Sequence, residues 1–213
     1  MRKIFDPENP FMQTLSRLTD LMILSICWSV CSVPIVTIGP ATAALYYVVL
    51  KMVEESESSV FRSFFRSFRR NLRQGVLLTL IVGLIAGLLI WNREILMNFA
   101  PDWGNVARIL YWVLGAVLVM GGSFLFPLLA RYENTVLGTL RNAFLMAFAY
   151  LPRGIAMGIL NLCPLGMFLF TPDTFYRIFP VWLIFAPGLI AYLCACLLKK
   201  PFGLSSHPDQ EQS

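Results

Sequence analysis

The sequence predicts an all-α fold: a polytopic transmembrane helix bundle of about six crossings, with two interfacial amphipathic helices on the cytoplasmic side. Hydrophobic residues make up 57% of the 213 residues, charged residues 14%, and the mean hydropathy is +0.68. Soluble domains are about a quarter charged. The apolar residues also gather into long runs, and the basic residues gather between alternate runs. These observations together indicate a membrane protein.

Six apolar runs predict the crossings, because most of them approach the roughly 20 residues that span about 30 Å of hydrocarbon. They cover residues 21–33, 35–53, 76–91, 106–130, 155–170 and 179–198. Pro34 and the pair Gly39-Pro40 interrupt the first two runs, which could form one broken helix or two short crossings joined by a tight turn. The second crossing, roughly 36–53, would be short and could be partly re-entrant.

Charge favours six crossings over five. With the densest basic segment, residues 62–73, on the cytoplasmic side, six crossings place fourteen of the 17 Lys and Arg residues inside and three outside. Five crossings change this to eleven and six, because three N-terminal basic residues move outside. We therefore expect a multi-pass protein of the cell (plasma) membrane with both termini cytoplasmic. Residues 1–200 form one integral membrane domain, and residues 201–213 form a polar cytoplasmic tail.

Residues 60–75, VFRSFFRSFRRNLRQG, predict an amphipathic helix with one aromatic face and one cationic face. The candidate residues for binding lipid or a partner are Phe61, Arg62, Phe64, Phe65, Arg66, Phe68, Arg69, Arg70 and Arg73. We expect the phenylalanines to enter the lipid interface while the arginines reach anionic headgroups. The arginines could instead serve only to hold this segment inside. Nucleic acid is not an expected partner, because single-strand binders present their aromatics beside the basic groups rather than on a separate stripe.

A weak internal repeat relates residues 46–91 to residues 126–171. It places Phe61 over Leu140 and Gly75 over Gly154. Each copy reads as a crossing with a basic end, a short acidic loop, an amphipathic helix, a glycine and a second crossing. The second amphipathic segment, residues 136–150, keeps an apolar stripe but carries only Arg141 as charge. A true duplication is expected of many membrane proteins, but two unrelated interfacial helices could also look alike.

The sequence lacks the constellations that catalysis needs, so we expect no enzyme, no cofactor and no metal. The one histidine, His207, lies in the polar tail, and of the acidic residues only Asp20 approaches a crossing. No Walker loop, GxSxG elbow or HExxH motif occurs. The five cysteines all lie within the spans and indicate apolar packing rather than disulfides.

Two packing features are ordinary in membrane helices but could also carry function. Gly83-x-x-x-Gly87 and Gly154-x-x-x-Gly158 predict close helix approach. Several prolines interrupt the spans, and broken helices line substrate sites in many transporters. These prolines are Pro34, Pro127, Pro164 and Pro187.

Four ordered segments resemble the YesL family of small bacterial integral membrane proteins. They are KIFDPENPF at 3–11, CSVPIVTIGPATAALYYVVLKM at 31–52, FRSFFRSFRRNLRQG at 61–75 and FPLLARYENT at 126–135. Members occur mainly in Gram-positive bacteria and are commonly encoded near carbohydrate ABC transporters and glycan-degrading enzymes, with no defined activity. The resemblance implies an accessory or regulatory role in carbohydrate uptake, with a carbohydrate ABC transporter component as partner. The alternative is a small transporter or channel for a solute.

Overall fold

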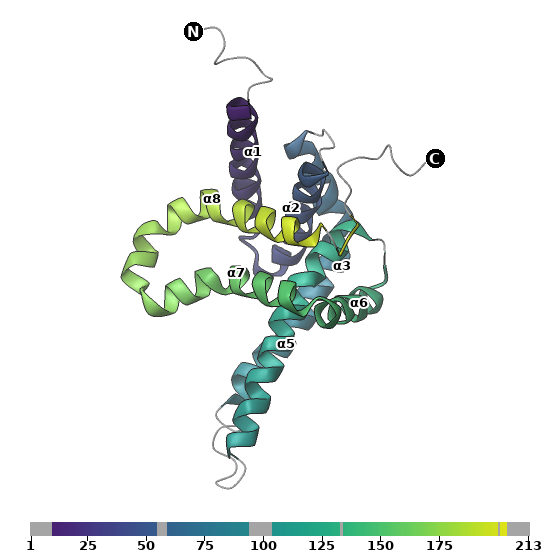
Figure 1. Ribbon diagram of the computed structural model, residues 1–213, viewed down its shortest axis with the longest axis vertical. Helices are drawn as coiled ribbons and strands as arrows, with labels where there is room; N and C mark the ends of the chain where they lie inside the picture. Colours follow the sequence, from purple (N-terminus) through teal and green to yellow (C-terminus); the bar gives the residue numbers. More distant parts are fainter. Residues whose placement is uncertain (1–9, 55–58, 94–103, 133, 200, 204–213) are drawn as a thin grey trace.

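The computed structural model describes residues 10–54, 59–93, 104–132, 134–199 and 201–203. Within these residues the chain forms helices and no strand (Figure 1). The elements are α1 (Pro10–Cys31), the 3-10 turn η2 (Ile35–Thr37), α2 (Ile38–Val53), α3 (Val60–Trp91), α5 (Gly104–Arg131), α6 (Val136–Ala149), α7 (Leu151–Phe170) and α8 (Pro172–Leu198). Six stretches of helix are long and apolar enough to cross a bilayer, namely α1, η2 together with α2, α3, α5, α7 and α8. The all-α prediction is confirmed, and six stretches of helix have the length and hydropathy that the six-crossing prediction requires.

The first two apolar runs form two helices joined by a tight turn. α1 ends at Cys31, and α2 runs back beside it (Figure 1). The hydroxyl of Thr37 closes the turn, because it lies 2.6 Å from the carbonyl oxygens of both Cys31 and Pro34. The indole N–H of Trp28 donates to the Thr42 hydroxyl at 3.0 Å and ties the two helices together just inside the turn.

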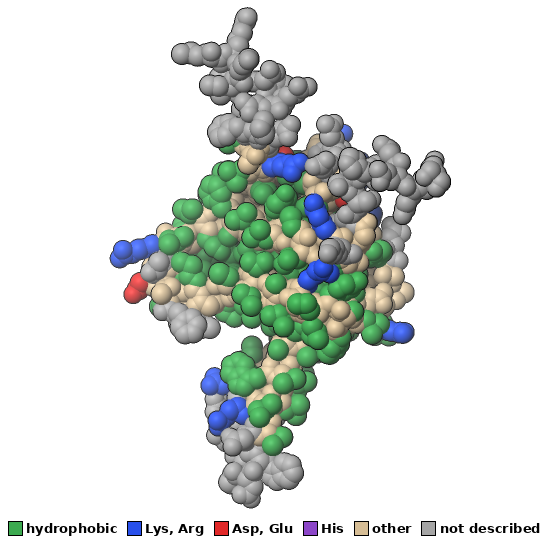
Figure 2. Space-filling view, in the orientation of Figure 1, with side chains coloured by type: hydrophobic (Ala, Val, Ile, Leu, Met, Phe, Trp, Pro, Cys, Tyr) green, Lys and Arg blue, Asp and Glu red, His purple; other side chains and the backbone are tan. Residues whose placement is uncertain are grey.

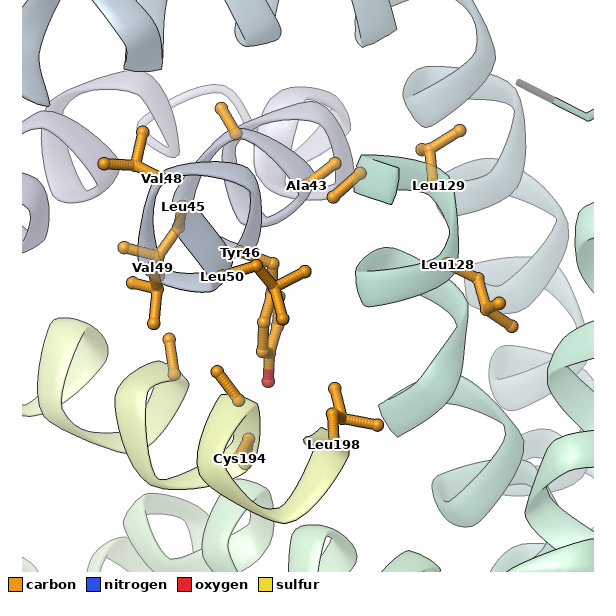
Figure 3. Packing of buried hydrophobic residues seen from close by; sticks show 14 of the residues in the cluster. Ala43, Leu45, Tyr46, Val48, Val49, Leu50, Leu128, Leu129, Cys194 and Leu198 are labelled. Atoms are coloured by element: carbon orange, nitrogen blue, oxygen red, sulfur yellow. The ribbon is translucent and has the colours of Figure 1, made fainter. Parts of the chain in front are cut away.

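Helix α2 is the central element of the core. It contacts α1, α3, α5 and α8, and most of its side chains are buried. Figure 3 shows several of them packed against α5 and α8. These are Ala43, Leu45, Tyr46, Val48, Val49 and Leu50, in one cluster with Leu128 and Leu129 of α5 and Cys194 and Leu198 of α8. The 16 residues of α2 extend about 24 Å at 1.5 Å per residue. Because protein surrounds this short helix, it does not have to match the thickness of the bilayer.

Helices α2 and α3 approach each other closely and form the most extensive helix pair among the described residues. A Cβ atom on Gly75 would lie 2.7 Å from the backbone nitrogen of Pro40, and one on Gly39 would lie 2.6 Å from the Gly75 carbonyl oxygen. Side chains cannot occupy such positions, so glycine on both helices allows the backbones to touch. The Thr79 hydroxyl donates to the same Gly75 carbonyl at 2.8 Å.

Two serines of α1 form hydrogen bonds to α8 next to Pro187. Pro187 has no N–H, so the Leu183 carbonyl lacks its usual donor four residues later. The hydroxyl of Ser29 donates to that carbonyl at 3.1 Å, and the hydroxyl of Ser25 accepts from the N–H of Gly188 at 2.9 Å. Hydroxyl groups of a neighbouring helix thus satisfy backbone groups that hydrocarbon could not.

The predicted glycine motifs have different outcomes. A Cβ atom on Gly154 would approach Met120 to 2.9 Å, and one on Gly158 would approach Val119 to 3.3 Å, so this motif does seat α7 on α5. Gly83 and Gly87 have no atom within 4 Å of such a Cβ. The prediction of close packing is therefore confirmed for the second motif and wrong for the first.

The helices are not parallel throughout. In Figure 1 the α7–α8 hairpin runs across the view, while α3 and α5 continue together below the rest of the molecule. The space-filling view shows hydrophobic side chains over most of this face, as lipid contact requires (Figure 2). The two hairpins separate toward the ends at which α3 joins α5 and α7 joins α8.

The glycine contact between α2 and α3 predicts a sharp positional difference along one helix. Gly75→Val should destabilise the protein by about 1–3 kcal/mol, because the added atoms overlap the backbone of Pro40. Gly83→Val is the matched control and should leave stability nearly unchanged, since open space surrounds that position. Thermal unfolding in detergent measures both variants. Equal melting temperatures would contradict this account of the core.

Candidate functional site

The predicted amphipathic segment 60–75 is the first half of α3 rather than a separate helix. α3 runs unbroken for 32 residues, about 48 Å, which exceeds the roughly 30 Å of the hydrocarbon layer. The prediction of two separate interfacial helices is therefore corrected for the first segment. The second segment does form a separate helix, α6, because Pro152 of α7 stands where α3 has Arg73 and interrupts the backbone hydrogen bonds.

The first half of α3 has three faces rather than two. One face is buried against the protein and consists mainly of small or polar residues. Its members are Phe64, Ser67, Asn71, Gly75 and Leu78. At 3.6 residues per turn, the centre of this buried face lies roughly a quarter of a turn around the helix from the predicted aromatic face. It lies almost opposite the arginines. The helix can therefore pack on α2 while it presents both its aromatic and its cationic side chains outward.

The predicted aromatic residues fall into two groups. Phe61 is 60% exposed, and Phe65 and Phe68 are partly buried at the edge of the core. Phe64 is 0% exposed, so it belongs to the core and cannot enter the lipid interface. This corrects the expectation for one of the four phenylalanines. The rings form a continuous group, since the centroids of Phe61 and Phe65 are 4.8 Å apart and those of Phe64 and Phe65 are 5.4 Å apart.

All five predicted arginines are exposed, and four of them form a surface that we call the cationic face. It consists of Arg62, Arg66, Arg69 and Arg73. Arg70 differs, because its guanidinium lies 5.3 Å from the ring centroid of Tyr47 and donates to the carbonyl of Ala130 at 3.4 Å. Arg70 thus connects α3 to α2 and α5 in addition to carrying charge.

Neighbouring contacts hold the cationic face in place at this end of the molecule. The side-chain amide of Gln74 donates to the Asn134 carbonyl at 2.7 Å, which links α3 to the turn before α6. Arg131, at the end of α5, pairs with Glu54 at the end of α2. Its guanidinium also lies over the ring of Phe202, 5.8 Å from the centroid. These contacts connect α2, α3, α5 and the turn before α6 at the end of the molecule that carries the cationic face.

Helix α6 repeats the arrangement seen in the first half of α3. Its buried face is again made of small residues, Thr139, Ala143 and Ala147. Its apolar stripe also lies roughly a quarter of a turn away, with Leu137 75% exposed and Phe148 59% exposed. In both copies the glycine after the amphipathic segment packs against the preceding crossing. The copies thus share a packing pattern, while their origin by duplication stays a prediction.

A second group of polar side chains lies between the crossings. Asn161 is exposed in the middle of α7, and its amide donates to the Ser123 hydroxyl at 3.1 Å. The hydroxyl of Tyr46 lies near Asn161 and Cys194. Asn161 and Tyr46 line a cavity of about 200 Å³ together with Thr42 and the indoles of Trp28 and Trp182. Pro164 and Pro187, which interrupt α7 and α8, border the same cavity.

In the sequence Asn161 is one polar residue within an apolar run, with no sign of the residues that surround it. Tyr46 and Thr42 occur within an ordinary apolar run, and the packing of α8 against both α2 and α7 brings them to the cavity that Asn161 lines. Among the described residues, no three His, Cys, Asp or Glu side chains gather in a way that could hold a metal ion. His207 lies outside the described residues.

Comparison with known proteins gives one match. Residues 21–93 match a family model described as "Protein of unknown function, DUF624". The matched segment covers less than half of the chain and contains the second half of α1, all of α2 and the whole of α3, including the Gly39–Gly75 contact and the cationic face. No curated protein and no solved structure matches the chain.

The division of the aromatic stripe predicts two different responses to truncation. Phe64→Ala should cost about 3–5 kcal/mol, because it leaves a cavity beneath α3. Phe61→Ala, on the same helix, should change stability by less than about 0.5 kcal/mol. Chemical or thermal unfolding of the purified protein measures both. A larger loss for Phe61→Ala than for Phe64→Ala would reverse the assignment of the two faces.

Proposed function

We propose that the protein is an accessory or regulatory membrane component of a carbohydrate uptake system, which acts through the cationic face of α3 in the cytoplasm. The observation that carries the proposal is the exposure of Arg62, Arg66, Arg69 and Arg73 on a helix longer than a bilayer crossing. The surface has two expected contacts, the anionic headgroups of the inner leaflet and a component of a carbohydrate ABC transporter.

The geometry supports an interaction surface in preference to a purely topological role. A topological role needs positive charge but no particular order of side chains. Here the arginines lie on one side of α3, the partly exposed phenylalanines adjoin them, and the third side is fixed to α2. Each arginine near an anionic membrane contributes about 1 kcal/mol of attraction. The exposed Phe61 can insert beside the headgroups, as in other interfacial helices.

The choice of carbohydrate uptake rests on the resemblance to the YesL family. That resemblance is consistent with the match of residues 21–93 to the DUF624 family model, whose description names no activity. The plasma membrane location and the cytoplasmic termini belong to the same proposal. They are supported by the charge distribution, since the cationic face and Arg131 lie at one end of the helices, with Arg93 and Arg108 at the other.

Affinity purification from the membranes of its own host tests the proposal. The tagged protein should recover a carbohydrate ABC transporter component, and changing all four arginines of the cationic face to Gln should reduce recovery at least tenfold. A variant with Arg93, Arg108 and Arg177 changed to Gln is the matched control and should recover as much as the wild type. The proposal fails if the wild type recovers no transporter component and if deletion of its gene leaves sugar uptake unaltered.

Solute transport is the second candidate function, and the cavity beside Asn161 favours it. A carboxamide exposed in the middle of a span is costly unless it faces water or a partner, and such residues often mark transport pathways. Interrupted helices next to polar groups are also typical of transporters. However, about 200 Å³ is below the usual 300–1,000 Å³ of small-molecule sites. We therefore rank transport below the accessory role.

Solute flux distinguishes the two functions. The accessory role predicts no protein-dependent uptake of mono- or disaccharides into proteoliposomes above that of empty vesicles. Protein-dependent uptake that is lost in both Asn161→Leu and Tyr46→Phe would replace the accessory role with transport. A variant of an exposed residue outside the cavity, Leu137→Ala, serves as the control.

A further inference from the structure

An apolar groove lies between α7 and the pair α3–α5. It encloses about 540 Å³ and is lined almost entirely by aliphatic, aromatic and glycine residues. Representative lining residues are Ala86 and Ile90 of α3, Trp112 and Gly115 of α5, and Gly158 and Leu162 of α7. Its lining residues on α3 and α5 lie toward the end opposite the cationic face. The two hairpins separate toward that end (Figure 1).

Small residues make the groove wide and keep it open. Gly158 sets α7 against Val119 of α5 at the narrow end. Farther along α5, a Cβ atom added to Gly115 would meet nothing within 4 Å, so the floor is unfilled there. Within a bilayer such an apolar surface is covered by hydrocarbon, because lipid chains are as apolar as the side chains that line it.

Two arginines stand at the wide end of the groove. Arg108 precedes Tyr111 and Trp112 by three and four residues, so it lies on the groove face of α5. Arg93 follows Ile90 of α3 by three residues. Both arginines are exposed. Figure 2 shows basic side chains beside hydrophobic ones at the lower end of the molecule, where α3 and α5 come together.

Tryptophans at the same level indicate the depth of this end in the membrane. Trp91 is 81% exposed and Trp112 is 66% exposed. Large exposed indoles at the end of a span are typical of the interface between headgroups and hydrocarbon. Arg93 and Arg108 therefore lie at the level of lipid phosphates, while the groove extends toward the middle of the bilayer.

We propose that the groove binds one anionic phospholipid, with an acyl chain along Gly115 and the phosphate at Arg93 and Arg108. The apolar lining selects a hydrocarbon chain, and the two guanidinium groups select negative charge over a zwitterionic headgroup. With the topology proposed above, the lipid belongs to the outer leaflet. The site is separate from the cationic face, so it can exist whether or not that face binds a transporter.

Native mass spectrometry of the full-length protein tests the site. Protein exchanged into detergent is incubated with equal amounts of phosphatidylglycerol and phosphatidylcholine, and the lipid retained per molecule is measured. The wild type should retain one phosphatidylglycerol in preference to phosphatidylcholine. Arg93→Gln with Arg108→Gln should reduce that preference by roughly fivefold for each arginine removed. Arg141→Gln with Arg177→Gln, two exposed arginines outside both the groove and the cationic face, is the matched charge control and should leave it unchanged.

A second variant tests the groove independently of charge. Gly115→Leu fills the floor and should abolish retention of the lipid, whereas Gly87→Leu, also in open space but not lining the groove, should leave retention intact. Equal retention of the two lipids by the wild type would overturn the proposal. Full retention by Gly115→Leu, or equal loss in Gly87→Leu, would do the same, because the lipid would then bind elsewhere on the apolar surface.

Discussion

The backbone contact between Gly39-Pro40 of α2 and Gly75 of α3 is the constraint on which the remaining structure depends. It brings the two helices closer than any side chain would allow, and so places α2 deep among α1, α3, α5 and α8. A short helix can occupy the centre because the protein itself, rather than lipid, satisfies its apolar surface. The same contact sets the rotation of α3 about its own axis.

That rotation determines which side chains of α3 are presented outward. Ser67, Asn71 and Gly75 recur every four residues and face the protein, so the arginines lie almost opposite the core. If all four phenylalanines were buried against the protein, the segment would present no aromatic surface to lipid or to a partner. Instead the phenylalanines adjoin the core at one edge and the surface at the other, which makes the segment suited to a lipid interface or a partner.

Glycine has two opposite effects in this protein, and tertiary context decides between them. At Gly39, Gly75, Gly154 and Gly158 the absence of a side chain allows helices to pack closely. At Gly115 it leaves an apolar space open to the bilayer, because α7 has already diverged. The helices pack closely at the end that carries the cationic face. Toward the other end α7 diverges from α3 and α5, and the apolar groove lies between them.

The sequence by itself determined the all-α class, the six spans and the charged segment, because hydropathy and charge depend on composition along the chain alone. It also correctly placed Phe61 and the arginines Arg62, Arg66, Arg69 and Arg73 on outward faces. The burial of Phe64, the joining of residues 60–75 to the following span, and the meeting of Tyr46 with Asn161 required the tertiary structure. Each of these depends on which helix lies alongside, and hydrophobic periodicity within one helix carries no information about its neighbour.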